Sequence, residues 1–360
     1  MKFPIRLVLG LLALVGCPAL AQPAPAPQVT EGDYVVRDFH FRSGESLPQL
    51  RLHYSTLGQP RRDAAGRVVN AVLILHGTGG DGHQFIRPQF SGVLFTPGGL
   101  LDPARWFIIL PDGIGHGRSS KPSDGLRARF PHYDYDDMVA AQHELLVHGL
   151  GVDHLRLVMG TSMGCMHSFV WGETYPGFAD ALMPLACLPI QLAGRNRLWR
   201  RMVIDAIQSD PAWRGGDYDT QPVAGLRTAA DLLVIAGSAP LLAQKTWPTR
   251  DAADAYVETR IAGDLKTLDA NDTLYQVAAS RNYDPSPGLE RITVPVMWVN
   301  SADDFINPPE LGIAEREVGR MPRARFVLIP ISDQTRGHGT HTLANLWQDH
   351  LAELLKEIGP

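Results

Sequence analysis

The chain has 360 residues, and 33 Lys and Arg against 38 Asp and Glu give a formal net charge of −5. Hydrophobic residues make up 44% and charged residues 20%, which excludes a disordered chain and a strongly basic protein built to bind nucleic acid. Three Cys are too few for a disulfide-built scaffold, while 35 Gly and 28 Pro predict many loops. The length allows one large domain or two medium ones.

The N-terminus has the layout of a secretory signal peptide. Lys2 and Arg6 are basic, and residues 7–15 form an unbroken apolar run. Ala19 and Ala21 are small residues three and one positions before a cut after Ala21. The run is too short for a membrane-spanning helix, and no other stretch is long and apolar enough to span a bilayer. We therefore expect an exported protein, either periplasmic or secreted.

A second cleavage pattern overlaps the first. Residues 14–17 (LVGC) resemble the lipobox of bacterial lipoproteins, in which the Cys is acylated after cleavage, so a lipid anchor at Cys17 is the alternative. We favour the cut after Ala21 because the Pro- and Ala-rich residues 22–28 have the composition of a linker.

Short apolar runs predict a mostly parallel sheet, because continuous runs suit strands that are buried on both faces. These runs are residues 68–75, 107–110, 155–159, 181–187, 294–300 and 326–331. Alternating residues 34–41 and 50–54 predict two further strands with a turn near Gly44. Helical patterns occur at residues 136–150, 308–318 and 342–358. This alternation predicts a wound α/β fold with flanking helices.

Residues 189–287 break the alternation, because they contain helical stretches such as 250–268 and no buried-strand run. We expect a helical insertion over the sheet. Its arginines at 195, 197, 200 and 201 favour a solvated helix, with binding of an acidic substrate as the alternative. The expected organisation is a signal peptide at 1–21, a linker at 22–32, an α/β core at 33–188 and 288–360, and the insertion at 189–287.

Residues 160–164 (GTSMG) match the G-x-S-x-G pattern of a nucleophile elbow, a tight turn between a strand and a helix. An apolar run precedes the motif and a helical pattern at 165–175 follows it, as the elbow requires. Glycines are needed because the turn leaves no room for side chains. The pattern predicts Ser162 as a nucleophile, with an ordinary Gly/Ser turn as the structural alternative.

Residues 76–80 (HGTGG) follow another apolar run. Acyl transfer places negative charge on the substrate oxygen, and losing one of the amides that stabilise it costs about 3–4 kcal/mol. We expect the backbone amides of Met163 and Thr78 to form this oxyanion hole, and a flexible turn is the alternative for 76–80. Residues 112–119 (DGIGHGRS) are assigned a loop-shaping role, because the lysine and glycine spacings of phosphate-binding loops are absent.

A serine needs a base to take its proton and an acid to orient the base. In α/β hydrolases the chain order is Ser, then Asp or Glu, then His. Asp304 and His338 each follow an apolar run in that order. Asp303 is the alternative acid, and Asp304 is favoured from its spacing to Pro308.

His341 is the alternative base, and His338 is favoured because glycines flank it as in an exposed loop tip. A metal pair of His338 and His341 is a further alternative, but the H-E-x-x-H pattern is absent. We expect no metal and no cofactor.

The sequence resembles the α/β-hydrolase superfamily, and more narrowly its homoserine O-acetyltransferase-like branch, over about residues 68–355. The most specific stretches are residues 160–167, 175–176 and 184–186, supported by 130–131 and the helix that begins at Asp136. The resemblance implies an acyl-enzyme mechanism with Ser162, Asp304 and His338 as the triad. It also implies a helical lid over about residues 189–287.

Two features depart from the transferase pattern. In homoserine acetyltransferases an Asp directly follows the catalytic His and helps to hold the substrate's amino group, whereas Gly339 stands here. Those enzymes also use acetyl-CoA, a cytoplasmic metabolite, whereas export is predicted here. We therefore expect a serine hydrolase that cleaves a small-molecule carboxylic ester. An O-acyltransferase and a non-catalytic binding protein are the alternatives, no nucleic-acid partner is expected, and the oligomeric state is left open.

Cys165 lies three residues after Ser162, and Cys187 ends the run at 181–187. An oxidising compartment permits a disulfide between them. We favour two buried free thiols, because the sequence supplies no Cα–Cα distance.

Overall fold

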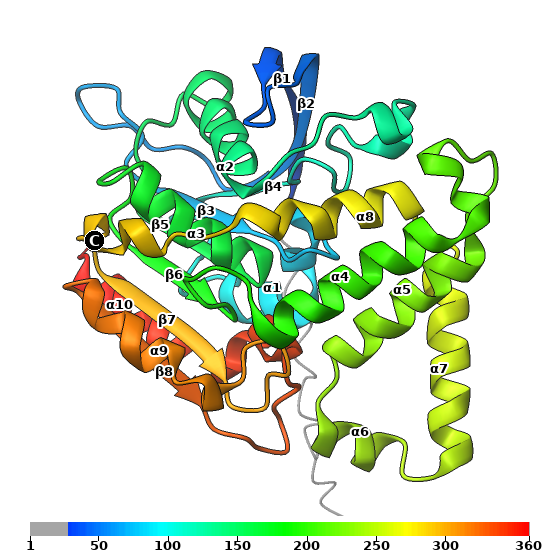
Figure 1. Cartoon of the computed structure of the whole chain (residues 1–360). Coiled ribbons are helices and arrows are strands. Elements are labelled where there is room, and N and C mark those ends of the chain that lie inside the picture. The colour runs from blue at the N-terminus through cyan, green and yellow to red at the C-terminus, as the bar shows by residue number, and fades with distance from the viewer. Residues whose placement is uncertain (1–27, 360) are drawn as a thin grey trace, which may run out of the picture.

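The computed structural model describes residues 28–359, which form an α/β protein around one sheet (Figure 1). The expected signal peptide, Cys17 and most of the expected linker lie outside these residues. The sheet has eight strands in the order β1-β2-β4-β3-β5-β6-β7-β8. The strands are β1 (Thr30–His40), β2 (Ser46–Leu57), β3 (Ala71–Leu75), β4 (Phe107–Pro111), β5 (Leu157–Thr161), β6 (Leu182–Leu185), β7 (Val296–Ser301) and β8 (Ala324–Ile329).

The sheet is mostly parallel, as the apolar runs predict. β2 pairs antiparallel with β1 and with β4, and every other neighbouring pair is parallel. β1 begins at Thr30, inside the segment 22–32 that its composition predicts as a linker, because the backbone of Thr30 is in register with Thr56 of β2. Backbone pairing rather than an apolar pattern extends this strand, so the sequence predicted its start too late.

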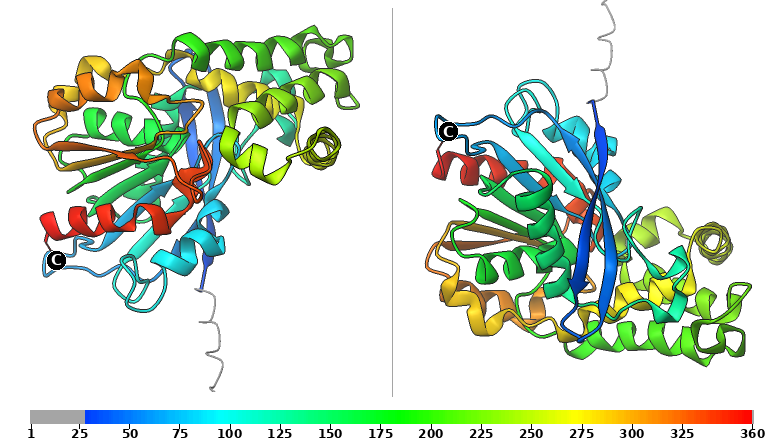
Figure 2. Two further views of the ribbon diagram at one scale, coloured as in Figure 1. Left: turned by 90° about the horizontal axis from the view of Figure 1, so that it is seen from below. Right: turned by 90° about the horizontal axis from the view of Figure 1, so that it is seen from above.

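Helices cover both faces of the sheet (Figure 2). Within β3, Leu73 and Leu75 belong to one apolar core and Val72 and Ile74 to the other, as alternating strand residues must. The first core packs under α2 (Tyr135–Glu144), α3 (Met163–Thr174) and α9 (Ile313–Glu317). The second core packs under α1 (Pro88–Leu94) and α10 (Gln348–Glu357). This two-layer covering explains why the central strands read as unbroken apolar runs.

Four helices are shorter than their patterns predict. α10 begins at Gln348 rather than at residue 342, because 3-10 turns precede it, and the helix that begins at Arg250 ends at Asp264 rather than at residue 268. α2 ends at Glu144 and continues as one π-helical turn over Leu145–Gly149. Only the second part of 308–318 is α-helical, because Gly312 has a positive φ of 58° that separates it from a short 3-10 turn at Pro309–Leu311.

The segment between β6 and β7 is helical, and much of it extends to one side of the sheet (Figure 1). It contains α4 (Gly194–Ser209), α5 (Val223–Ala236), α6 (Pro240–Thr246), α7 (Arg250–Asp264) and α8 (Ala270–Ala278). α4 and α5 pack together through buried apolar side chains such as Val203 and Leu226. Within residues 28–359 no single helix is long and apolar enough to cross a membrane, although α5 and α6, bent by 104°, pass that test as a pair.

Candidate active site

Ser162 occupies a sharp turn between β5 and α3. Its backbone has φ 54° and ψ −109°, a left-handed conformation that costs a non-glycine residue of order 1–3 kcal/mol. The amide of Ser162 donates to the carbonyl of Leu185 in β6 over 2.8 Å, and the amide of Gly164 donates to the carbonyl of His76 over 2.9 Å. These bonds hold the strained turn against two neighbouring strands, so its serine is presented at the sheet edge.

The two glycines of the elbow are required by close backbone contacts. A Cβ at Gly160 would lie 2.0 Å from the carbonyl oxygen of Gly164, and a Cβ at Gly164 would lie 2.0 Å from that of Leu75. Neither carbonyl is the flexible end of a side chain, so the backbone itself would have to move.

Replacing Gly164 by Ala is therefore expected to destabilise the protein by about 3 kcal/mol or more, since overpacking against backbone has no side-chain escape. Urea unfolding would measure the change in the free energy of unfolding. Gly92→Ala is the matched control, because its added Cβ meets nothing within 4 Å inside α1. Equal stability of the two variants would contradict the close-contact explanation.

His338 lies between Ser162 and Asp304. The hydroxyl of Ser162 donates to Nε2 of His338 over 2.8 Å, and Nδ1 of His338 donates to Oδ2 of Asp304 over 2.9 Å. The three residues follow β5, β8 and β7, at the carboxyl ends of parallel strands where open α/β sheets place their sites. In this arrangement an imidazole can take the serine proton while the carboxylate fixes the orientation of the ring.

The carboxylate of Asp304 is fully buried yet stays charged. Burial raises its pKa, but His338 and hydrogen bonds from Asn307 and from the amide of Ile306 outweigh burial and hold the pKa below its ordinary value. Asn307 Nδ2 donates to Asp304 Oδ2 over 2.9 Å and to the carbonyl of Ala186 over 3.0 Å. The sequence interpretation missed Asn307, whose position three residues after Asp304 was the available signal.

Asp303 and His341, the alternative acid and base, have other roles in the structure. Asp303 accepts from the amide of Gly337 over 2.9 Å and from the hydroxyl of Ser301, so it positions the loop that carries His338. Burial, and next the neighbouring His338, lowers the pKa of His341 to about 3. The hydroxyl of Ser162 is hydrogen-bonded to His338 and to neither of these residues. Residues 28–359 contain no group of three or more His, Cys, Asp or Glu side chains that could hold a metal ion.

The amides expected to form the oxyanion hole are free. Met163 is the first residue of α3, and within the described chain neither its amide nor that of Thr78 donates to a protein acceptor. Nε2 of His116 lies 2.9 Å from the carbonyl oxygen of Thr78, which ties this loop to the segment 112–119. Two unpaired amides beside a serine hydroxyl are suited to stabilise an oxyanion.

The segment 112–119 has the structural role expected for it. Oδ1 of Asp112 accepts from the amide of Gly82, and Oδ2 accepts from the amide of Arg118, each over 2.8 Å. The hydroxyl of Ser119 donates to the carbonyl of Asp112 over 2.8 Å. These bonds fix the shape of the loop, and the one from Gly82 ties it to the segment that follows β3.

The expectation of two free thiols is wrong, because Cys165 and Cys187 form a disulfide with a Cα–Cα distance of 5.8 Å. Cys165 lies in the first turn of α3, and Cys187 follows the end of β6. Both residues are buried. The carbonyl of Cys187 accepts from Trp298 Nε1 of β7 over 3.0 Å, so the bond ties the elbow helix to the neighbouring strands.

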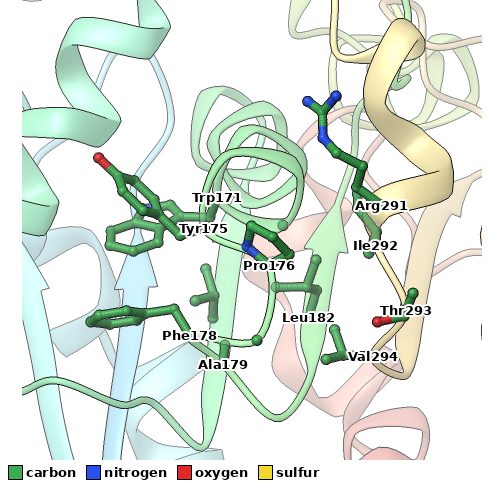
Figure 3. Close-up of a pocket in the computed structure, with 13 residues that line it drawn as sticks. Trp171, Tyr175, Pro176, Phe178, Ala179, Leu182, Arg291, Ile292, Thr293 and Val294 are labelled. Atoms are coloured by element: carbon green, nitrogen blue, oxygen red, sulfur yellow. The ribbon is translucent and has the colours of Figure 1, made fainter.

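Two cavities differ in their relation to the site. The pocket in Figure 3 has a volume of about 10 Å³ and lies at the end of α3 that is remote from Ser162, among Tyr175, Pro176 and Phe178. A larger apolar cavity of about 730 Å³ has Asp303 and Asp304 on its wall. It lies between the start of α4, the start of α6 and the segment after β7, so it adjoins the triad.

The chain belongs to the alpha/beta hydrolase fold family, whose model matches residues 70–331. It is similar in sequence to a probable acyltransferase from Methanothermobacter thermautotrophicus, at 29% identity over 85% of this chain and 91% of that protein. A homoserine O-acetyltransferase from Thermobifida fusca is 29% identical over 74% of this chain and 78% of its own length. The solved structure of the acetyl esterase MekB matches with a TM-score of 0.78 at 24% identity, over 91% of this chain and 97% of that one.

Proposed function

We propose that this protein is an O-acyltransferase that forms an acyl-enzyme on Ser162 and passes the acyl group to a small hydroxyl acceptor. The hydrogen-bonded series from Ser162 through His338 to Asp304 carries this proposal, together with the two free amides beside the serine. The two sequence relatives described above are named as a probable acyltransferase and a homoserine O-acetyltransferase, whereas the likeness to an esterase is one of fold. Transfer is therefore better supported than the hydrolysis that the sequence favoured.

The proposed reaction has two halves. His338 Nε2 takes the proton of Ser162, whose oxygen attacks the donor's carbonyl carbon, and the amides of Thr78 and Met163 hold the resulting oxyanion. The protonated imidazole gives its proton to the leaving group, and the acyl-enzyme remains. The acceptor hydroxyl then loses its proton to His338 and attacks the acyl carbon. As the bond from that carbon to Ser162 breaks, the imidazolium returns the proton to the serine oxygen. Asp304 stays charged throughout and stabilises the imidazolium.

Hydrolysis is the second candidate, and one residue favours it. Gly339 stands directly after His338, where the homoserine acetyltransferases carry an Asp that helps to hold the acceptor's amino group. Without that carboxylate, water competes more readily with an amino-acid acceptor for the acyl-enzyme. An acceptor without an amino group does not depend on this position.

Partitioning of the acyl-enzyme distinguishes the two functions. With phenyl acetate as donor and a panel of small alcohols, hydroxy acids and hydroxy amino acids as acceptors, we expect formation of the new ester to exceed release of acetate for at least one acceptor. Acetate release that no acceptor diverts would favour hydrolysis. A folded protein that releases no phenol and takes no fluorophosphonate label would instead be a binding protein.

We also propose that the protein is exported after removal of residues 1–21. The buried disulfide between Cys165 and Cys187 supports export, because such bonds persist in oxidising compartments. Mass spectrometry of the mature protein is expected to find Gln22 at the N-terminus. A diacylated Cys17 would replace this proposal with a lipoprotein, and a retained N-terminus would contradict export.

A further inference from the structure

Arg200 of α4 is a buried cation without an anion. Only 2% of its surface is exposed, although the sequence favoured a solvated helix for the arginines between 195 and 201. Its Nε donates to Asn196 over 2.9 Å, and one terminal nitrogen donates to the hydroxyl of Ser280 over 3.2 Å. Its other terminal nitrogen donates to no residue in 28–359, and no carboxylate in that range lies within ion-pair distance of it.

A second guanidinium, that of Arg197, lies near Arg200. Burial, and next the charges of Arg281 and Arg200, lowers the pKa of Arg197, which shows that these cations lie close enough to repel one another. One terminal nitrogen of Arg197 is also buried without a partner in the described chain. Removing a guanidinium from water costs several kcal/mol unless an opposite charge is supplied. The residues from 28 to 359 supply none here.

The surroundings of Arg200 extend to residues 76–80, which carry the expected oxyanion amide of Thr78. The side chains of Thr78, Ser280 and Arg200 lie close enough to the hydroxyl of Tyr135 to lower its pKa against the larger effect of burial, although none of them has the geometry of a hydrogen bond to it. The buried hydroxyl of Thr78 is likewise unpaired within the described residues. The residue before it, Gly77, is so near the nucleophile that an added Cβ would lie 3.3 Å from Cβ of Ser162. Unpaired donors therefore extend from the guanidinium to the neighbourhood of the serine.

We propose that Arg200, with the hydroxyls of Tyr135 and Thr78, forms a subsite for a carboxylate carried by the substrate that reacts at Ser162. A guanidinium binds a carboxylate through charge-assisted hydrogen bonds, and its free terminal nitrogen remains available for one. The carboxylate supplies the missing opposite charge and accepts from both hydroxyls. It belongs either to the acyl half, as in a half-ester of a dicarboxylic acid, or to the alcohol half, as in an ester of a hydroxy acid.

This inference rests on the proposed acyl-enzyme and is tested with two pairs of esters of similar shape. Monophenyl succinate and phenyl butyrate differ by a carboxylate on the acyl half, and 2-acetoxypropionate and sec-butyl acetate differ by one on the alcohol half. We expect the wild type to prefer the charged member of one pair, measured as the ratio of kcat/KM, which identifies the half that carries the carboxylate. Arg200→Met is expected to lower that ratio by about 100-fold.

Arg201→Met is the matched control, because Arg201 lies on the same helix but is exposed and paired with Asp205. It should keep the wild-type ratio. Arg200→Lys retains the charge without the planar fork and should give an intermediate ratio. It also replaces Arg200→Met as the test if the latter fails to fold.

Three results would overturn the subsite: no preference for a charged ester in the wild type, an unchanged ratio in Arg200→Met, or an equal loss in Arg201→Met. If the wild type turns over the uncharged esters in that case, the proposed acyl-enzyme survives without the subsite. If no ester is turned over and no fluorophosphonate label is taken, the proposed function itself fails.

Discussion

Ser162→Ala is expected to lower kcat for phenyl acetate by about 10⁴- to 10⁶-fold, because the acyl-enzyme cannot form without the hydroxyl. The free amides of Thr78 and Met163 remain in the variant, so a small residual rate above that in water is expected. Phenol release measures the turnover, and fluorophosphonate labelling gives an independent readout of the nucleophile. Both signals should disappear together.

Ser168→Ala is the control for this variant. Ser168 is also a buried serine of α3, and its hydroxyl donates to the carbonyl of Gly164 over 2.9 Å. Its loss is expected to cost about 1 kcal/mol of stability and to leave labelling intact. Phenol release at the wild-type rate from a folded Ser162→Ala variant would remove the serine from the mechanism.

The parallel part of the sheet could be predicted because burial leaves a direct trace in the sequence. β3, β4, β5, β6 and β7 are buried at every position, and each lies largely within a predicted apolar run. β1 is mostly exposed, so its first residues carry no such trace. The sequence therefore gives the centre of the sheet better than its N-terminal edge.

The candidate triad could be predicted from the order of its residues in the chain and from their positions after strands. The choice between Asp303 and Asp304 had weaker support from the sequence. Asp303 and Asp304 follow the same strand, and the sequence does not say which carboxylate turns toward His338. The structure distinguishes the two carboxylates by their hydrogen-bond donors. Asp304 accepts from Asn307 and from the amide of Ile306, whereas Asp303 accepts from the amide of Gly337. Such pairings depend on tertiary contacts that spacing does not encode.

The disulfide and the burial of Arg200 could not be predicted from the sequence either. Cys165 and Cys187 are 22 residues apart, and they meet because α3 packs directly against β6. Arg200 looks like its neighbours in a run of arginines, and its burial depends on tertiary contacts such as the one with Ser280. Both features arise where the insertion and the elbow helix meet the sheet.

Asp304→Asn is expected to lower kcat by about 10⁴-fold while leaving the fold intact. The amide has nearly the shape of the carboxylate, but its nitrogen can donate to Nδ1 of His338 and so stabilise the tautomer whose Nε2 carries a proton. In that tautomer, Nε2 of His338 already carries a proton and cannot accept the one from Ser162. Turnover of phenyl acetate measures the loss, and circular dichroism checks the fold.

Asp303→Asn is the matched control, because it removes the adjacent carboxylate, which bonds Gly337 and Ser301 instead of His338. We expect it to lower kcat by about 10-fold or less, because it shifts the loop that carries His338 but does not change the tautomer of the imidazole. A larger loss in Asp303→Asn than in Asp304→Asn would exchange the roles of the two residues. The pKa of Asp304 lies below its ordinary value, so its carboxylate is charged at neutral pH, where the rates of the two variants are compared.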